Sequence, residues 1–265
     1  FIHEGEAALS FAQKMAGAGI VFDKQASEGK VNLSAIEEGL LVIDEERLKK
    51  FNMLGNVICA SRENYSLLKK GDAIAGTRIT PLYISKDDHL RALALLEEGP
   101  LFTIHKLRKA RVGIIVTGTE VYENLVEEKY GTIMQHKVEQ YGCKVIEKRL
   151  APDSVAIIST GIKELVEKGA DLIICTSGMS VDPDDVTVES MIAAGAENAH
   201  YGIPVLPGCL FFLGKIGQAQ LVGVPASGLY DDYFSFDLLL PRLLANIEIK
   251  KEDFAKLGHS GLLKY

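Results

Sequence analysis

The sequence is poor in the residues that mark secreted, zinc-binding or membrane-spanning proteins. Its 265 residues include four cysteines, six histidines and no tryptophan. The cysteines are far apart and form no Cys-x-x-Cys pair, and the histidines are scattered, so neither a disulfide framework nor a structural zinc site is expected. Small buried thiols of this kind are typical of a cytoplasmic protein. The cysteines are Cys59, Cys143, Cys175 and Cys209.

An excess of positive charge is also absent. The chain has 29 Lys and Arg against 36 Asp and Glu, for a formal net charge of −7. Nucleic-acid binding needs clustered cations, so nucleic acid is not an expected partner, although a local anion site remains compatible with this balance. No uncharged apolar run approaches the ~20 residues of a membrane helix, so no membrane partner is expected either. The chain begins at Phe1 rather than Met, and we expect a trimmed N-terminus.

Three common catalytic fingerprints are missing. The sequence has no Gly-x-Gly-x-x-Gly after a predicted strand, no P-loop and no Gly-x-Ser-x-Gly elbow. The chain therefore lacks the motifs of dinucleotide dehydrogenases, P-loop nucleotidases and α/β-hydrolases. With 47% hydrophobic residues the chain still has enough apolar surface for a large core.

The first 107 residues predict a small α+β domain with a meandering sheet. In the opening helix, apolar side chains recur on one face. Glu38-Gly39 is expected to form a hairpin turn, and Asp44 and either Asp87 or Asp88 to cap helices. We expect helices at 4–18, 44–51 and 87–98 and strands at 30–36, 40–43, 56–61 and 73–84. Residues 101–107 are expected to form the last strand or the connection to the next domain.

From residue 108 to 250 the pattern becomes a regular alternation of strand and helix. This alternation predicts right-handed crossovers and a mostly parallel sheet, hence an α/β domain, with residues 251–265 as a C-terminal tail. Asp153 is expected to cap the second helix, and Pro241 to interrupt the last. The expected strands are 112–116, 144–150, 172–175 and 220–224, and the expected helices are 131–141, 154–168, 185–195 and 230–244.

Polar, glycine-rich segments follow the strands of this second domain. In parallel sheets, ligands bind at this edge, beside the carboxyl ends of the strands. The segment 176–187 is the most informative. Gly178 lets backbone approach a ligand, and N–H groups with the Ser177 and Ser180 hydroxyls suit phosphate. The carboxylates of Asp182, Asp184 and Asp185 suit phosphate only with Mg²⁺ between them. A solvated turn in which Asp185 merely caps the next helix accounts for the same residues.

Two further features have a plain structural interpretation. The acidic run of Glu120, Glu123, Glu127 and Glu128 is typical of a solvated face. Cys209 follows Gly208 and is a candidate reactive thiol, but the apolar residues after it favour burial.

Residues from about 110 to 245 resemble the molybdopterin-binding domain of molybdenum-cofactor biosynthesis proteins, the group of MoeA, MogA and gephyrin. The resemblance rests on Val-Thr-Gly-Thr-Glu at 116–120, on TSGMSVDPDDVT at 176–187, and on PVLPG at 204–208 followed by GVPAS at 223–227. The first third resembles the preceding region of stand-alone molybdopterin-binding proteins. The motifs occur in the family's order and spacing, so together they are specific.

The resemblance implies a three-layer α/β/α domain that binds molybdopterin or an adenylylated molybdopterin, with Mg²⁺ involved. It implies catalytic roles for Asp185 and Asp182, and a metal site of Asp182, Asp184 and Asp185. The implied ligand-binding residues are Thr117, Gly118, Thr119, Glu120, Ser177, Gly178, Met179, Ser180, Pro207, Gly208, Pro225, Ala226 and Ser227.

Several positions depart from the family pattern. Thr119 replaces an Asp, Ser177 replaces the second Gly of the loop, and Cys209 stands where the family has Lys. These departures argue against metal-dependent catalysis more than against ligand binding, because the backbone N–H groups of a loop remain when its side chains are substituted.

Three functional hypotheses follow. The first is binding of molybdopterin or its adenylylated form in cofactor biosynthesis or delivery, with nucleotidyl or molybdenum transfer as the expected chemistry of any turnover. The second is a CinA-like hydrolase of nucleotide pyrophosphates. The third is a non-enzymatic cofactor sensor or chaperone that docks a molybdoenzyme or another cofactor-biosynthesis protein. The resemblance also implies a homo-oligomer.

Overall fold

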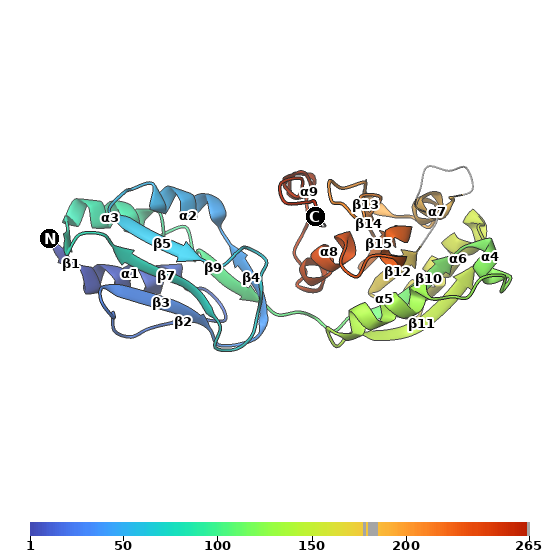
Figure 1. Cartoon of the computed structure of the whole chain (residues 1–265), viewed down its shortest axis with the longest axis horizontal. Coiled ribbons are helices and arrows are strands. Elements are labelled where there is room, and N and C mark those ends of the chain that lie inside the picture. The colour runs from blue at the N-terminus through green and yellow to red at the C-terminus, as the bar shows by residue number, and fades with distance from the viewer. Residues whose placement is uncertain (177–178, 180–184, 264–265) are drawn as a thin grey trace. The chain divides into compact units, whose positions relative to one another are not determined.

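The computed structural model describes residues 1–176, 179 and 185–263, which form two compact units, Phe1–Leu107 and Arg108–Tyr265 (Figure 1). We call them the N-terminal unit and the C-terminal unit and describe each by itself. Within the described residues, no helix has both the length and the apolar character needed to cross a membrane.

The N-terminal unit is built around an antiparallel sheet in the order β2-β3-β7-β5 (Figure 1). A second sheet has the order β6-β4-β9, and β1 pairs with β8. The strands are β1 (Ile2–His3), β2 (Ile20–Phe22), β3 (Lys30–Ala35), β4 (Gly39–Ile43), β5 (Val57–Ser61), β6 (Leu67–Leu68), β7 (Ala73–Ile79), β8 (Tyr83–Ile84) and β9 (Phe102–His105). The helices are α1 (Glu4–Met15), α2 (Glu45–Asn52) and α3 (Lys86–Ala94).

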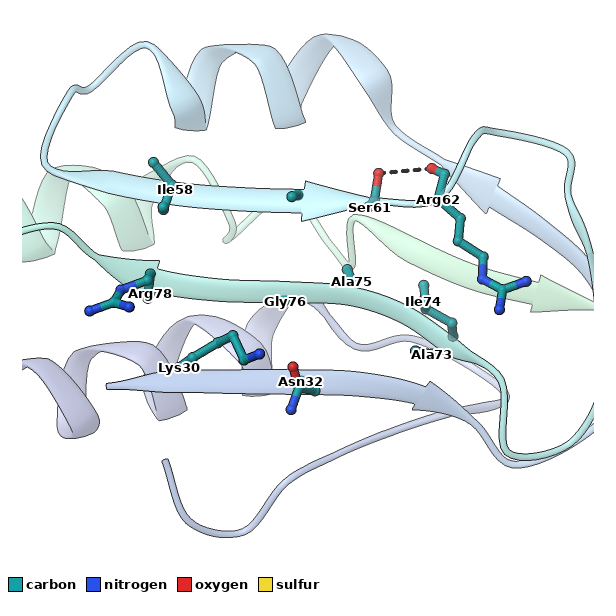
Figure 2. A pocket seen from close by; sticks show the side chains of 11 residues that line it. Lys30, Asn32, Ile58, Ser61, Arg62, Ala73, Ile74, Ala75, Gly76 and Arg78 are labelled. Carbon is teal, nitrogen blue, oxygen red and sulfur yellow. Dashed lines mark hydrogen bonds between the residues drawn. The ribbon is translucent and has the colours of Figure 1, made fainter. Parts of the chain in front are cut away.

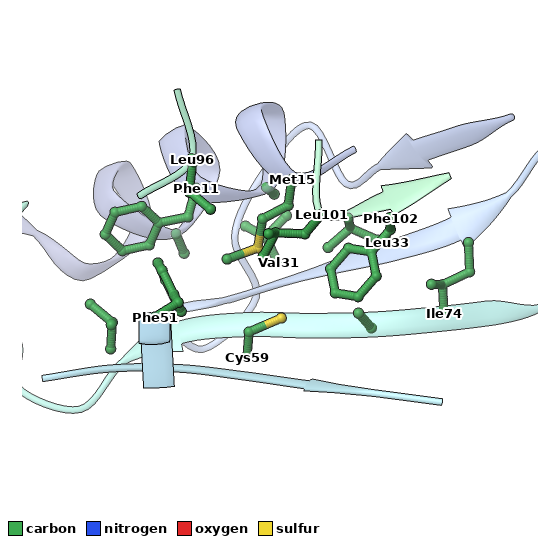
Figure 3. Close-up of a cluster of buried hydrophobic side chains, with 14 of the residues drawn as sticks. Phe11, Met15, Val31, Leu33, Phe51, Cys59, Ile74, Leu96, Leu101 and Phe102 are labelled. Atoms are coloured by element: carbon green, nitrogen blue, oxygen red, sulfur yellow. The ribbon is translucent and has the colours of Figure 1, made fainter. Parts of the chain in front are cut away.

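Helix α1 packs one face onto this sheet, as its apolar spacing predicts. Ala8, Phe11, Ala12 and Met15 are fully buried, and Figure 3 shows Phe11 and Met15 facing the side chains of the strands. The rings of Phe11 and Phe51 meet edge to face with centroids 5.3 Å apart. Burying each large side chain contributes about 1.5–3 kcal/mol, so this face holds the unit together.

The hairpin expected through Glu38-Gly39 is wrong. Strand β3 pairs with β2 and β7, whereas β4 pairs with β6 and β9 in the other sheet. A Cβ on Gly39 would lie 2.6 Å from the His105 carbonyl oxygen, so Gly39 serves close strand contact rather than a turn. The apolar run after it is a buried central strand, which sequence alternation does not distinguish from a hairpin arm.

Two local expectations in this unit also change. The cap of α3 is Ser85, whose Oγ accepts from the Asp88 N–H at 3.0 Å, rather than Asp87 or Asp88. The strand expected over 73–84 divides into β7 and β8. The cap of α2 by Asp44 is confirmed, since its carboxylate accepts from the Arg47 N–H at 3.0 Å.

The C-terminal unit has a six-stranded sheet in the order β11-β10-β12-β15-β14-β13. Strands β11, β10, β12 and β15 are parallel, and β14 and β13 continue the sheet antiparallel. The strands are β10 (Arg111–Thr117), β11 (Lys144–Ala151), β12 (Leu172–Thr176), β13 (Glu197–Tyr201), β14 (Phe212–Ile216) and β15 (Ala219–Val224). The helices are α4 (Thr119–Tyr122), α5 (Tyr130–Glu139), α6 (Val155–Glu167), α7 (Thr187–Ala193), the 3₁₀ helix η1 (Ala226–Leu229), α8 (Ser235–Leu244) and α9 (Lys251–Lys256).

Helices cover both faces of this sheet. Helices α6 and α7 pack on the face that carries Ile115 and Cys175, where their residues share one apolar cluster with the strands. Helix α5 approaches the opposite face so closely that a Cβ on Gly131 would lie 2.9 Å from the Val116 side chain. Helix α8 is joined to α5 by the ion pair of Lys137 and Asp237. The predicted three-layer α/β/α fold with a mostly parallel sheet is confirmed.

Three details differ from expectation in this unit. Asp153 does not cap α6, because its carboxylate accepts from the Thr119 N–H at 2.8 Å and the Thr119 hydroxyl at 3.0 Å. The helix expected over 230–244 is α8, which begins at Ser235 and continues through Pro241. The expected tail includes α9, where the buried Phe254 stacks on His200 of β13 at 4.3 Å between centroids.

Candidate functional site

A pocket of about 300 Å³ lies in the C-terminal unit at the carboxyl ends of β12 and β15. These strands are adjacent and parallel, so the segments that follow them meet at one edge of the sheet. The loop before β14 completes the wall. The lining residues are Met179, Asp185, Gly208, Cys209, Leu210, Pro225, Ala226 and Ser227.

Met179 forms a buried wall of the pocket and is fixed at both ends. Its carbonyl oxygen accepts a hydrogen bond from the Tyr201 hydroxyl. Its side chain crosses Gly223, where an added Cβ would lie 2.5 Å from Met179 Cε. Gly223 therefore provides the space that lets the Met179 side chain pack against β15.

Gly208 lets the Pro207-Gly208 loop approach helix α8. Its φ of +104° is in the region that favours glycine, and an added Cβ would lie 2.2 Å from Ser235 Oγ and 3.1 Å from the Ser235 backbone nitrogen. The Ser235 N–H donates to the Pro207 carbonyl at 3.2 Å. This contact brings Gly208 and Cys209 to the rim of the pocket.

The third wall is the turn at Pro225, Ala226 and Ser227. The Tyr130 hydroxyl of α5 donates to the Pro225 carbonyl, and burial raises the pKa of the Tyr130 phenol well above its ordinary value, so it stays a donor. The Ser227 hydroxyl oxygen is buried and has no hydrogen-bond partner among the described residues. A buried hydroxyl without a partner costs free energy, so Ser227 offers a polar contact to a ligand.

Asp185, Cys209 and Tyr201 supply the polar chemistry of this region. Burial raises the pKa of the Tyr201 phenol, and Cys209 and Asp185 raise it further, because negative charge on either would oppose phenolate. Asp185 and Cys209 are half-buried. The site therefore has a carboxylate, a thiol and a protonated phenol near one another.

The first strand-end turn does not contribute to the described lining. The Thr117 side chain is 1% exposed, and its Oγ1 donates to the Thr176 carbonyl at 2.8 Å and lies 2.9 Å from Thr187 Oγ1. It ties β10 to β12 and to the start of α7. Gly118 and Thr119 begin α4, and Glu120 is exposed. Pro207 lies beside the pocket, next to Gly208.

Five of the predicted site residues lie outside the described residues, namely Ser177, Gly178, Ser180, Asp182 and Asp184. Within the described part of the chain, no group of three or more His, Cys, Asp or Glu has the arrangement of a metal site. Asp185 is the one carboxylate among the described residues that line the pocket.

Sequence reasoning missed Tyr130 and Tyr201. Tyr130 was expected only as the residue before a helix, and β13, which carries Tyr201, was not expected at all. Strand β13 is mostly exposed and does not alternate between apolar and polar residues, so it gives no periodic signal.

The fold and the pocket define a three-layer α/β domain with a pocket at the carboxyl edge of its sheet. Residues 113–230 match the family model described as a probable molybdopterin binding domain. This match confirms the resemblance inferred from the strand-end motifs, and it contains every described residue that lines the pocket.

Individual proteins are similar to parts of this chain. A CinA-like protein of Mycobacterium leprae is 34% identical over 80 residues, which cover 30% of this chain and 19% of that protein. The chain thus spans about a fifth of that relative. Among solved structures, the molybdopterin biosynthesis enzyme MoaB from Thermus thermophilus is 19% identical with a TM-score of 0.47, covering 52% of this chain and 94% of that one. The molybdopterin biosynthesis Mog protein from Mycobacterium ulcerans is 23% identical with a TM-score of 0.45, covering 52% and 99%.

Proposed function

We propose that the pocket at the carboxyl ends of β12 and β15 binds molybdopterin or adenylylated molybdopterin, in biosynthesis or delivery of the molybdenum cofactor. The observation that carries this proposal is the coincidence of pocket and family match, since all eight lining residues lie within the matched residues 113–230. A cytoplasmic location and a molybdoenzyme partner remain predictions that accompany this function.

The chemistry of the lining suits a pterin. Met179, Leu210 and Pro225 give an apolar wall for a flat ring, and the Asp185 carboxylate accepts from the N–H groups at a pterin edge. The unpartnered Ser227 hydroxyl offers one more hydrogen bond. A volume of about 300 Å³ is at the small end for ligand pockets, so it accommodates the pterin part of either ligand, and the adenylyl part of the larger ligand would extend beyond it.

No Lys or Arg is among the described lining residues, so a ligand phosphate would be held by backbone N–H groups and hydroxyls. Bound Mg²⁺ would neutralise phosphate charge in a nucleotidyl or molybdenum transfer. Asp185 alone does not make a magnesium site, and the roles of Asp182 and Asp184 rest on their place in the sequence motif. We therefore assign binding to this pocket and derive no transfer step.

Equilibrium dialysis against molybdopterin under anaerobic conditions tests this function, with two variants and a matched control. Ala226→Phe fills the pocket from an exposed position and should abolish binding, whereas Ala94→Phe, at an exposed site of α3, should bind like the wild type. Asp185→Asn should weaken binding by about tenfold, since it removes a charged acceptor. Absence of saturable binding to the wild type, or equal binding by Ala226→Phe, contradicts the proposal.

A second candidate is hydrolysis of nucleotide pyrophosphates, favoured by the identity shared with CinA-like proteins. Incubation with ADP-ribose or NAD and Mg²⁺, followed by chromatography of the products, separates the two functions. Release of AMP by the wild type but not by Asp185→Ala, with no molybdopterin binding, supports this candidate. Molybdopterin binding without product release supports the first.

A further inference from the structure

The outer face of the main sheet of the N-terminal unit carries a groove of about 510 Å³ (Figure 2). The opposite face is covered by α1, so the groove is the solvent side of the sheet. Two rows of cross-strand neighbours build it. Lys30, Arg78 and Ile58 lie in register on β3, β7 and β5, and Asn32, Gly76 and Ala60 form the next row.

The difference in side-chain size between the rows makes the hollow. Gly76 and Ala60 have the smallest side chains of the second row, whereas Lys30 and Arg78 in the first row have long ones. The Lys30 stem lies over this floor, because a Cβ on Gly76 would come within 3.5 Å of Lys30 Cδ. Ile58 adds an apolar surface that is 44% exposed.

The charged side chains among the described lining residues of the groove are all positive. Lys30 stands directly opposite Arg78 in the ladder, and like charges in this position destabilise a sheet. Arg78 has Glu4 at 3.6 Å and Arg62 has Asp72 at 3.6 Å, whereas Lys30 forms no ion pair with any described residue. No carboxylate is among the described lining residues, so an anionic partner would relieve the repulsion.

The C-terminal unit exposes a surface of complementary character, which we call the acidic segment, comprising residues 122–127. Tyr122, Leu125 and Val126 are 50%, 71% and 50% exposed, and Glu123 and Glu127 are exposed beside them. Glu127 forms an exposed ion pair with Lys129 at 3.3 Å, which a partner cation would have to replace, and Glu123 forms no ion pair with any described residue. The N–H groups of Leu125 and Val126 donate to the Glu120 carbonyl at 2.8 and 3.3 Å. These hydrogen bonds fix the backbone of the segment at two of its exposed apolar residues. Three exposed apolar side chains in five residues are unusual on a free surface.

We propose that the groove of one copy binds the acidic segment of a second copy. Glu123 and Glu127 would face Lys30 and Arg78, and the apolar side chains of the segment would cover Ile58 and the floor at Ala60 and Gly76. Each chain has one groove and one segment, so the contact is head to tail, and repeats of it build larger assemblies. This gives the homo-oligomer predicted from the sequence a specific interface, independent of the proposed function.

Sedimentation velocity over a range of protein concentrations tests this interface. The wild type should self-associate, and added NaCl should weaken the association because the contact depends on exposed charges. Lys30→Glu and Glu123→Lys should each weaken it by about tenfold or more. The matched controls Lys24→Glu and Glu167→Lys change exposed charges outside both surfaces and should associate like the wild type.

A mixing experiment tests the head-to-tail geometry. Lys30→Glu retains an intact segment and Glu123→Lys an intact groove, so each alone should associate weakly. The equimolar mixture should regain association, because each groove then meets a segment of opposite charge. The double variant Lys30→Glu with Glu123→Lys should recover association with reversed charges. A wild type that stays monomeric at all concentrations, or variants that associate like the controls, overturns the proposal. Circular dichroism of each variant verifies that it is folded.

Discussion

At the scale of single residues, Gly208 combines a left-handed backbone with a close packing contact. Gly208→Ala places a methyl group 2.2 Å from Ser235 Oγ at a φ of +104°, so strain and overpacking add. We expect a loss of about 2–4 kcal/mol in the free energy of unfolding, measured by urea denaturation. Gly195→Ala is the control, because its φ of +101° carries the same backbone strain in open space. Equal losses for the two variants would contradict the packing contact.

The thiols differ in their accessibility, which predicts an order of alkylation. Burial raises the pKa of the Cys59 and Cys175 thiols to about 12, so both stay protonated and unreactive at about pH 8.5 in the folded protein. Cys209 is half-exposed at the pocket and should react first with iodoacetamide, as read by mass spectrometry of tryptic peptides.

The same raised pKa values have a consequence for stability. The unfolded chain releases these protons near pH 9 and the folded chain only near pH 12, so between these values the folded state holds more protons and stability falls as pH rises. Labelling of Cys59 or Cys175 as fast as Cys209 at about pH 8.5 would contradict both the burial of these two thiols and the order of alkylation predicted from it.

The strand-end segments could be identified from the sequence, but the role of each residue in them could not. Glycine and polar residues after buried strands predict where loops gather, and six of the predicted residues line the described pocket: Met179, Asp185, Gly208, Pro225, Ala226 and Ser227. The hydroxyl of Thr117 is satisfied by Thr176 and Thr187, which are distant in sequence. Such contacts depend on how the strands are paired, which residue spacing does not encode.

At the scale of elements, helices α5 and α8 are joined by one nearly buried ion pair. Lys137 Nζ lies 2.6 Å from Asp237 Oδ1, with side chains 12% and 17% exposed, and Asp237 also accepts from the Phe234 N–H at 3.1 Å. Asp237→Ala leaves the Lys137 charge without its counter-ion and removes a cap, so we expect a loss of about 2–3 kcal/mol.

Urea denaturation measures this loss, and a double-mutant cycle with Lys137→Met isolates the pair. The control is Glu97→Ala, whose partner Lys14 is 45% exposed, so its loss should be below about 1 kcal/mol. A similar small effect for Asp237→Ala would show that the pair does not hold the two helices together.

Elements with strong periodicity were predictable, and those whose burial depends on distant partners were not. Helix α1 and strands β10, β12 and β15 have clear apolar patterns and occur where expected. Strand β4 was assigned to a hairpin because its partners β6 and β9 lie far along the chain. Strand β13 was missed because its sequence is that of an exposed edge strand.

At the scale of the whole molecule, the two units have separate apolar cores. The core around α1 includes residues of the N-terminal unit alone, and the core around α6 includes residues of the C-terminal unit alone. The proposed ligand pocket is built from the second unit, whereas the groove at Lys30 belongs to the first. Ligand binding and self-association are therefore assigned to different surfaces.

Hydrogen exchange of the full chain, read by mass spectrometry with and without molybdopterin under anaerobic conditions, tests whether the pocket at β12 and β15 binds this ligand. We predict slower exchange in peptides that contain residues 208–210 and 226–229, because a bound ligand restricts the loops that line the pocket. Residues 1–107 should exchange at unchanged rates. Unchanged exchange at both loops, or protection confined to the N-terminal unit, would contradict the assignment of the pocket.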